Sequence, residues 1–206
     1  MDLEIKEFLE ERNITRLCHF TKISNLESIL NNGLLSLDTL ENKGLNYSYN
    51  DEQRLEKKRD AICTSITFPN YKMFYKYREI INGGNEEYCV LILDASVLYE
   101  KKCLFCITNA ASNKEKYRHD YDKMGIKGLK ELFYDHDCRQ VGLLGLEYAT
   151  DPQAEVLVLE DIEINYIKSI NFISGETDFP WKEFSNMIFY QNEDLFKYRD
   201  DYEYWS

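Results

Sequence analysis

The chain has 206 residues, enough for one domain with a sizeable hydrophobic core and short for two. Hydrophobic residues make up 44% and aromatic residues 14%, a composition that excludes a largely disordered chain. The formal net charge of −12 argues at first against nucleic-acid binding, because phosphates repel an acidic surface. However, residues 51–130 hold 15 Lys/Arg against 12 Asp/Glu, whereas residues 151–206 hold 4 against 13. The acidity is concentrated near the C-terminus, and the middle of the chain could present a basic face.

The N-terminal residues are acidic rather than a charged and apolar leader, and no apolar run approaches the length of a membrane span. We therefore expect a single cytoplasmic domain over residues 1–206, with reduced, buried thiols. Cys103 and Cys106 have the spacing of two metal ligands, but His119, His136 and Cys138 supply no second close pair. The sequence predicts a strand at this position and no metal site.

The first half of the chain predicts a helix over residues 2–12 and a strand over residues 15–20. Ser24 and Glu27 have the spacing of a capping box, and Gly33 is placed to end the following helix in a left-handed conformation. Residues 36–59 are polar and predict a long loop with a short helix near residues 52–58. Loops of this length are often functional.

The second half predicts strands over residues 61–68, 89–93, 104–108, 154–159 and 164–173. Helical patterns lie within residues 113–136 and in a closing helix near residues 181–190. Residues 71–78 interleave aromatic and basic side chains and fit either a helix or an extended segment. Strands with interspersed helices that do not strictly alternate are typical of an α+β domain.

The tripeptide Gln153-Ala154-Glu155 precedes an apolar run and begins the strand predicted over residues 154–159. Side chains alternate along a strand, so Gln153 and Glu155 are expected on one face and Ala154 in the opposite layer. An amide and a carboxylate on one face could hold a sugar and a base together.

Four motifs form a set: His19-Phe20-Thr21, the loop ending at Arg54, the block Phe68 to Phe74, and Asp151 to Val158. Their order resembles the DarT family of nucleic-acid-modifying ADP-ribosyltransferases, over residues 17–166. The resemblance implies a split β-sheet core with peripheral helices. It also implies an enzyme that cleaves the nicotinamide–ribose bond of NAD and transfers ADP-ribose to a base in single-stranded DNA. A toxin of a toxin–antitoxin or phage-defence system, with a neutralising antitoxin, is implied as well.

The reaction needs a negative charge beside the oxocarbenium-like ribose that forms as nicotinamide leaves, and a group that takes a proton from the attacking base. Glu155 is the predicted catalytic carboxylate. Arg54 matches the arginine that holds the NAD phosphates or the incoming base, with Arg59 as the alternative in a loosely aligned region. The resemblance further places His19, Phe20, Thr21 and Asn25 on NAD, and Gln153 on the ribose or a nearby loop.

Base stacking needs aromatic faces beside cations, and residues 71–78 supply both. The polar loop over residues 108–112 could also approach the substrate, whereas Phe74 and Tyr77 are expected to pack in the core. We expect the nucleic acid to contact Tyr71, Lys72, Met73, Lys76 and Arg78.

Two alternatives stay open from the sequence. The acidic surface also fits RNA or a protein side chain as the acceptor. The acidic, aromatic C-terminal end fits a binding module without catalysis in a regulatory complex, because contiguous exposed aromatic residues often mark interfaces.

Overall fold

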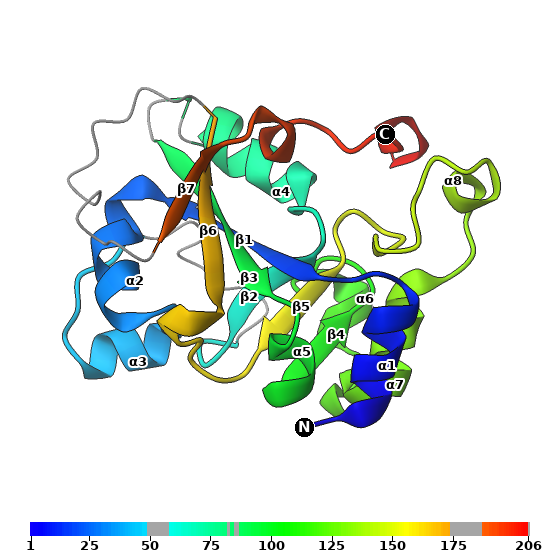
Figure 1. Ribbon diagram of the computed structural model, residues 1–206, viewed down its shortest axis with the longest axis horizontal. Helices are drawn as coiled ribbons and strands as arrows, with labels where there is room; N and C mark the ends of the chain where they lie inside the picture. Colours follow the sequence, from blue (N-terminus) through cyan, green and yellow to red (C-terminus); the bar gives the residue numbers. More distant parts are fainter. Residues whose placement is uncertain (49–57, 82, 85–86, 174–186, 206) are drawn as a thin grey trace.

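The computed structural model describes residues 1–48, 58–81, 83–84, 87–173 and 187–205, and a seven-stranded sheet runs through its centre (Figure 1). The strands lie in the order β4-β5-β2-β1-β3-β6-β7. Neighbouring strands are antiparallel except for β6 and β7, which are parallel. The bounds are β1 Arg16–Lys22, β2 Ile62–Ile66, β3 Tyr88–Asp94, β4 Cys103–Cys106, β5 Glu155–Val158, β6 Ile167–Phe172 and β7 Ile188–Gln191.

The sheet splits between its two central strands. β1 pairs with β3 over its whole length, but it pairs with β2 only at Leu17 and Cys18, opposite Ile66 and Ser65. Beyond Cys18 the two strands separate, and β2 continues its pairing with β5 on the other side. The predicted α+β fold with a split β-sheet core is confirmed, and the split is where a cavity can form.

The helices lie around the sheet, as predicted. Figure 1 shows α1, α5 and α7 grouped near β4, α2 and α3 at the opposite end of the molecule, and α4 beside the C-terminal segment. The bounds are α1 Leu3–Glu11, α2 Leu26–Asn32, α3 Leu37–Asn42, α4 Tyr71–Tyr75, α5 Val97–Glu100, α6 Asn113–Lys116, α7 Gly125–Lys130 and α8 Asp137–Gln140.

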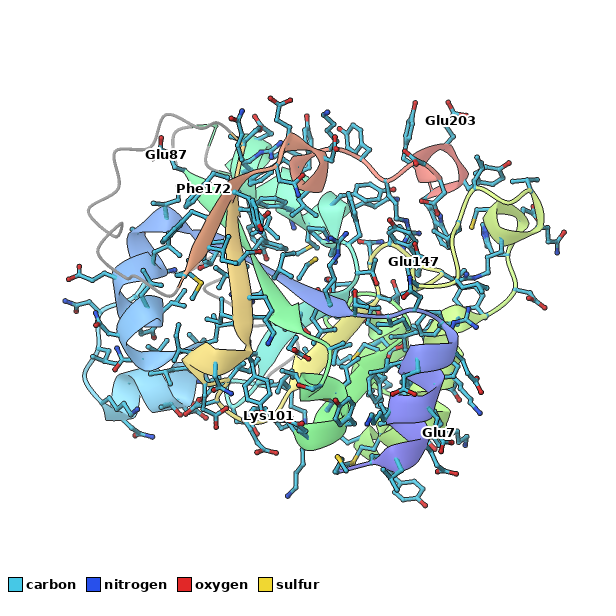
Figure 2. All side chains as sticks on the ribbon, in the orientation of Figure 1. Glu7, Glu87, Lys101, Glu147, Phe172 and Glu203 are labelled. Atoms are coloured by element: carbon cyan, nitrogen blue, oxygen red, sulfur yellow. The ribbon has the colours of Figure 1, made fainter. Side chains whose placement is uncertain are left out.

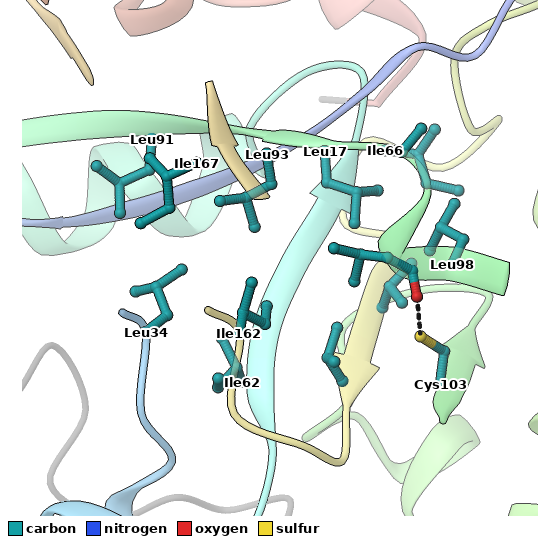
Figure 3. Close-up of a cluster of buried hydrophobic side chains, with 14 of the residues drawn as sticks. Leu17, Leu34, Ile62, Ile66, Leu91, Leu93, Leu98, Cys103, Ile162 and Ile167 are labelled. Atoms are coloured by element: carbon teal, nitrogen blue, oxygen red, sulfur yellow. Dashed lines mark hydrogen bonds between the residues drawn. The ribbon is translucent and has the colours of Figure 1, made fainter. Parts of the chain in front are cut away.

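The largest hydrophobic cluster packs on one face of the sheet (Figure 3). Leu17 of β1 and Leu93 of β3 are register partners and are fully buried, and Ile162 closes over them from the loop after β5. Burial of each such side chain stabilises the fold by about 1.5–3 kcal/mol. At the margin, the Cys103 thiol donates to the Val97 carbonyl at 3.8 Å. This cluster fixes the strands whose edges form the split.

The helix predicted over residues 2–12 and the one ending near Gly33 are confirmed, but the predicted capping box is wrong. A 3₁₀ turn over Ile23–Asn25 precedes α2, and the Ser24 hydroxyl donates to Ser48 Oγ at 3.2 Å instead of capping the helix. Gly33 ends α2 at φ +79°, and a Cβ there would lie 2.4 Å from the Ile162 carbonyl oxygen. Glycine is therefore required at residue 33 by both conformation and space.

Two further predictions need correction. The predicted loop over residues 36–59 contains α3, which Ser36 caps by accepting a hydrogen bond from the Thr39 amide. The helix predicted near residues 181–190 is wrong at its C-terminal end, because Ile188–Gln191 forms strand β7 and pairs with β6. Residues 181–186, and residues 52–57 of the short helix predicted near residues 52–58, lie outside the described residues.

The C-terminal segment, residues 193–205, folds back onto the domain. Arg199 and Asp201 form a buried two-point ion pair at 2.6 and 2.7 Å. Arg199 also donates to the carbonyls of Ala149 and Thr150, at 2.8 and 2.7 Å. The sequence left open that the acidic C-terminal end is a docking surface. Part of this segment instead packs within the chain, where Arg199 contacts the residues that precede β5.

Charged side chains surround the domain (Figure 2). Glu7 on α1, Glu87 before β3 and Glu203 near the C-terminus are all exposed. Lys101 in contrast is largely covered and pairs with Glu163 at 2.7 Å. Within the described ranges, we find no helix whose length and apolar character would suit a bilayer crossing.

Candidate active site

A cavity of about 200 Å³ opens where β1 and β2 separate. Its lining combines polar residues from strands, loops and α2 with apolar residues mainly from α2, α3 and β2. The polar members include His19, Asn25, Ser48, Asn70, Asn109 and Glu155, and the apolar members include Ile29, Leu34, Leu37, Leu40, Ile62 and Met73. The cavity can accept a ligand with both a polar and an apolar part.

Glu155 is the first residue of β5 and is half-buried in this lining. Its Oε1 accepts hydrogen bonds from the side-chain amides of Asn70 and Asn109, each at 3.3 Å. Its Oε2 accepts from the Ala110 backbone amide at 2.8 Å. Donors from two separate segments therefore hold both carboxylate oxygens, and the catalytic role of Glu155 stays a prediction.

The donors around Glu155 were only partly found from the sequence. The loop over residues 108–112 was expected to approach the substrate, and Asn109 and Ala111 do line the cavity. Asn70 lies within the block Phe68 to Phe74, and the sequence assigned it no role of its own. It caps α4, with its Oδ1 accepting from the Met73 amide at 3.2 Å. The signal for this was an asparagine immediately before a helical segment.

His19 lies on β1 next to the last residue that pairs with β2. Its Nδ1 is 2.8 Å from the Cys63 carbonyl oxygen of β2. A carbonyl oxygen only accepts, so Nδ1 carries the hydrogen of this contact. The side chain thus replaces a missing ladder contact, and it also lines the cavity.

Phe20, Thr21 and Asn25 also line the cavity. The Phe20 ring stacks on Phe74 with centroids 4.7 Å apart, so one of its faces is covered. Thr21 accepts a hydrogen bond from Asn25 Nδ2 at 3.0 Å. Asn25 in addition binds the backbone of Ser48 twice, at 2.7 and 3.0 Å. Asn25 therefore fixes a loop residue at the edge of the cavity.

The predicted nucleic-acid contacts in residues 71–78 are placed differently from one another. Met73 lines the cavity. Tyr71 is buried, Lys72 donates to the Trp205 carbonyl, and Lys76 is exposed. Arg78 lies over the Phe74 and Phe196 rings and donates to the Phe196 carbonyl. The structure brings one of the five into the cavity and uses three of them in packing.

The sequence predicted that Arg54, with Arg59 as the alternative, holds the NAD phosphates or the incoming base. Arg54 is outside the described residues. Arg59 pairs with Asp38 at 3.1 Å and with Glu41, both on α3. These bonds raise the pKa of Arg59 above its ordinary value, with the Glu41 hydrogen bond as the main cause. Arg59 is therefore held on α3 rather than in the cavity lining.

Gln153 lies in the turn before β5, because the strand begins only at Glu155. Its backbone amide donates to Asp151 Oδ1 at 2.7 Å. Ala154 is buried in the core. The expected alternation holds between Ala154 and Glu155, while the role of Gln153 stays a prediction.

The cysteine pair is not arranged as metal ligands. Cys103 and Cys106 are buried along β4, and burial raises the pKa of each thiol to about 12. Across the described part of the chain, no three His, Cys, Asp or Glu side chains gather as a metal site would require.

Comparison with known proteins gives one family. Residues 18–188 match the model of the family described as "ssDNA thymidine ADP-ribosyltransferase, DarT". Similar solved structures include Thermosipho africanus DarTG in complex with ADP-ribose, with a TM-score of 0.63 and 19% identity, covering 88% of this chain. This chain spans 50% of that DarTG chain, about half its length. No curated protein matches the chain.

A second organism provides further similar structures. Thermus sp. 2.9 DarT in complex with carba-NAD+ has a TM-score of 0.59 and 18% identity, with 89% of this chain and 98% of that chain covered. The same Thermus protein in complex with ADP-ribosylated ssDNA has a TM-score of 0.56 and 17% identity, covering 90% and 97%. At such identities the likeness establishes the fold.

Proposed function

This chain belongs to the DarT family, and on that premise we propose that it transfers ADP-ribose from NAD+ to a thymidine base in single-stranded DNA. NAD+ is the co-substrate, and nicotinamide is the leaving group. The observation that carries the proposal is Glu155, held by Asn70, Asn109 and the Ala110 amide in the lining of the cavity.

In the reaction the bond between the nicotinamide nitrogen and the ribose C1′ breaks, and its electron pair leaves with nicotinamide. The ribose acquires oxocarbenium character, and the Glu155 carboxylate stabilises this charge more than it stabilises the ground state. A base nitrogen then bonds to C1′. Glu155 takes the proton that this nitrogen loses and returns it to water.

Thymidine as the acceptor makes the role of Glu155 as a proton acceptor more specific. Thymine has no exocyclic amine, and its N1 is bonded to the sugar, so N3 is its one nitrogen with a hydrogen to lose. The N3–H is weakly acidic, and attack therefore requires an acceptor for its proton at the moment of bond formation. Glu155 is the carboxylate that meets this need in the cavity lining.

The remaining lining suits NAD+. His19 lines the cavity with its Nδ1 engaged by the Cys63 carbonyl, and its ring suits a contact with the nicotinamide end of NAD+. The apolar surface of α2 and α3, with Ile29, Leu37 and Leu40, suits the flat face of adenine. Arg54 remains the proposed phosphate-binding arginine, and the position of Arg59 on α3 favours Arg54 over it.

We further propose that the protein acts in the cytoplasm as a toxin, and that a separate antitoxin neutralises it. One support is that a DNA-modifying reaction would harm its host. Another is that a similar structure is named DarTG, and its chain is about twice as long as the part that this chain covers. Expression of the chain alone should arrest growth in a way that requires Glu155. Co-expression of an antitoxin encoded by a neighbouring gene should relieve the arrest.

The acceptor is tested by incubating the full chain and NAD+ with a DNA oligonucleotide that contains a single thymidine. A thymidine-free oligonucleotide and a uridine-containing RNA of the same sequence serve as matched acceptors. We expect a mass gain of one ADP-ribose on the first oligonucleotide alone. A gain on RNA alone, or on no nucleic acid, would contradict the proposal.

A further inference from the structure

Two asparagines from distant parts of the chain converge on one oxygen of Glu155. Asn70 lies between β2 and α4, and Asn109 lies in the loop after β4. Both donate Nδ2 to Oε1, at 3.3 Å. One hydrogen bond would be enough to satisfy this oxygen, so the second amide donor suggests that the position of the carboxylate is closely controlled.

Each side-chain amide is oriented by a backbone N–H two or three residues further along the chain. Asn70 Oδ1 accepts from the Met73 amide at 3.2 Å, and Asn109 Oδ1 accepts from the Ala111 amide at 3.0 Å. If either amide were turned over, its oxygen would face the carboxylate and its NH₂ group would face a backbone N–H. Both contacts would be repulsive, so the local turns fix Nδ2 on Glu155.

The supports behind the two asparagines are buried. Asn70 is 1% exposed. The loop with Asn109 is anchored by Glu115, which is fully buried and whose Oε1 accepts from the Ile107 amide at 3.0 Å. Rigid surroundings of this kind hold a side chain in one rotamer, which a catalytic carboxylate needs.

We propose that Asn70 and Asn109 are a pair of positioning residues, which hold the Glu155 carboxylate in its place in the cavity and favour its charged form by donating to it. This inference rests on the catalytic role of Glu155 in the proposed function. Neither asparagine is assigned a step in the chemistry. Their contribution reaches the reaction through Glu155.

The two substitutions Asn70→Asp and Asn109→Asp separate orientation from folding. Aspartate keeps the acceptor oxygen for the backbone amide and nearly the same shape, but it replaces the donor with a second carboxylate oxygen. A like charge beside Glu155 disfavours its charged form. The acid limb of the pH profile should therefore move to higher pH, with kcat lowered about tenfold or more and the KM for NAD+ nearly unchanged.

Other titratable groups near Glu155 enter the same pH profile and are shared by all variants. They are Cys106 of β4, Cys63 of β2, His19 of β1, Tyr77 after α4 and Glu115 of α6. Burial raises the pKa of Cys106 to about 12, so this thiol stays neutral through the range measured.

Matched controls come from the chain. Asn31→Asp adds the same charge on the exposed surface of α2, where the side chain donates to the Glu27 carbonyl of its own helix at 2.9 Å. It should leave the profile of wild type unchanged. Asn70→Ser keeps a helix-capping oxygen but removes the amide donor without adding a charge, and it should lower kcat with a much smaller shift of the acid limb.

The rate of ADP-ribose transfer to the single-thymidine oligonucleotide is measured from about pH 3.5 to 9 for each variant, a range that begins below the ordinary glutamate pKa of about 4.3. A displaced acid limb in both Asp variants, absent from Asn31→Asp, supports the inference. If wild type is active, Glu155→Gln is inactive and both Asp variants keep the wild-type profile, the positioning role is overturned.

A wild type that modifies no oligonucleotide, or a fully active Glu155→Gln, would instead overturn the proposed function. Melting temperatures are measured in parallel. Should the buried Asn70→Asp variant fail to fold, the less buried Asn109→Asp variant decides by the same criterion.

Discussion

Glu155 and the segment over residues 71–78 lie on two sides of the same cavity, and their polar side chains have different partners. Glu155 is held by donors whose positions are set by short local turns. In residues 71–78, Lys72 and Arg78 instead bind carbonyl groups of the C-terminal segment. Both regions have the residue types expected of a binding site, but Lys72 and Arg78 in the second region are engaged by the C-terminal segment.

The difference shows that charge and aromatic content alone do not identify a substrate surface. Arg78 covers the Phe74 ring, and Tyr71 packs its ring against Tyr198 with centroids 5.6 Å apart. These contacts make the segment a support for the wall that carries Asn70 and Met73. We therefore expect changes in the C-terminal segment to act on stability, and changes around the cavity to act on turnover.

The largest effect is expected from Arg199→Met. It leaves the fully buried Asp201 without its partner, which should lower the free energy of unfolding by about 3–5 kcal/mol. Urea unfolding of both proteins measures the loss. Lys197→Met is the matched control, because its ion pair with Asp194 is exposed and should be worth little. Equal stability of the two variants would show that the C-terminal segment is not a support.

Asp201→Asn should give a smaller loss that depends on pH. Burial is the largest single influence on Asp201 and disfavours its charge, but the hydrogen bond and the charge of Arg199, together with the Trp205 hydrogen bond, outweigh burial and lower the pKa of the carboxyl. A lowered pKa stabilises the fold above the unfolded value of about 4, and this contribution is lost as the pH falls through the folded pKa. The stability difference from wild type should therefore shrink between pH 7 and pH 3. A constant difference would contradict this assignment.

Asn25→Ala tests the cavity side of the comparison. It removes both hydrogen bonds to the Ser48 backbone and should raise the KM for NAD+ about tenfold, with a smaller change in kcat. Steady-state kinetics with varied NAD+ measures the effect. Ser24→Ala is the control, since Ser24 makes one exposed bond to Ser48 Oγ. A KM equal in both variants would remove Asn25 from the NAD+ site.

The smallest effect is expected from Tyr71→Phe. The Tyr71 hydroxyl is buried and, in the described part of the chain, has no hydrogen-bond partner. Burial raises the pKa of this phenol to about 12, so it is neutral at pH 7. Removing the hydroxyl should leave activity unchanged and alter stability by less than about 1 kcal/mol. Loss of DNA modification in this variant would return Tyr71 to the substrate site.

The sequence predicted the parts of the site that local patterns determine. Glu155 follows a turn and begins an apolar strand. His19 lies on a strand that its periodicity indicates, and Asn25 lies in the turn immediately before the predicted helix. Asn70 was missed because its role depends on a strand 85 residues away. The partners of Lys72 and Arg78 were missed for the same reason, since the C-terminal segment reaches them only in the folded chain.

The central claim is that the Glu155 carboxylate drives transfer and does not merely bind NAD+. Single-turnover transfer to the one-thymidine oligonucleotide, with NAD+ binding measured by calorimetry on the same preparations, tests it by comparing wild type with Glu155→Gln. We predict that Glu155→Gln binds NAD+ with nearly wild-type affinity and transfers ADP-ribose slower by a factor on the order of 10²–10⁴. Transfer at the wild-type rate in Glu155→Gln would contradict the account.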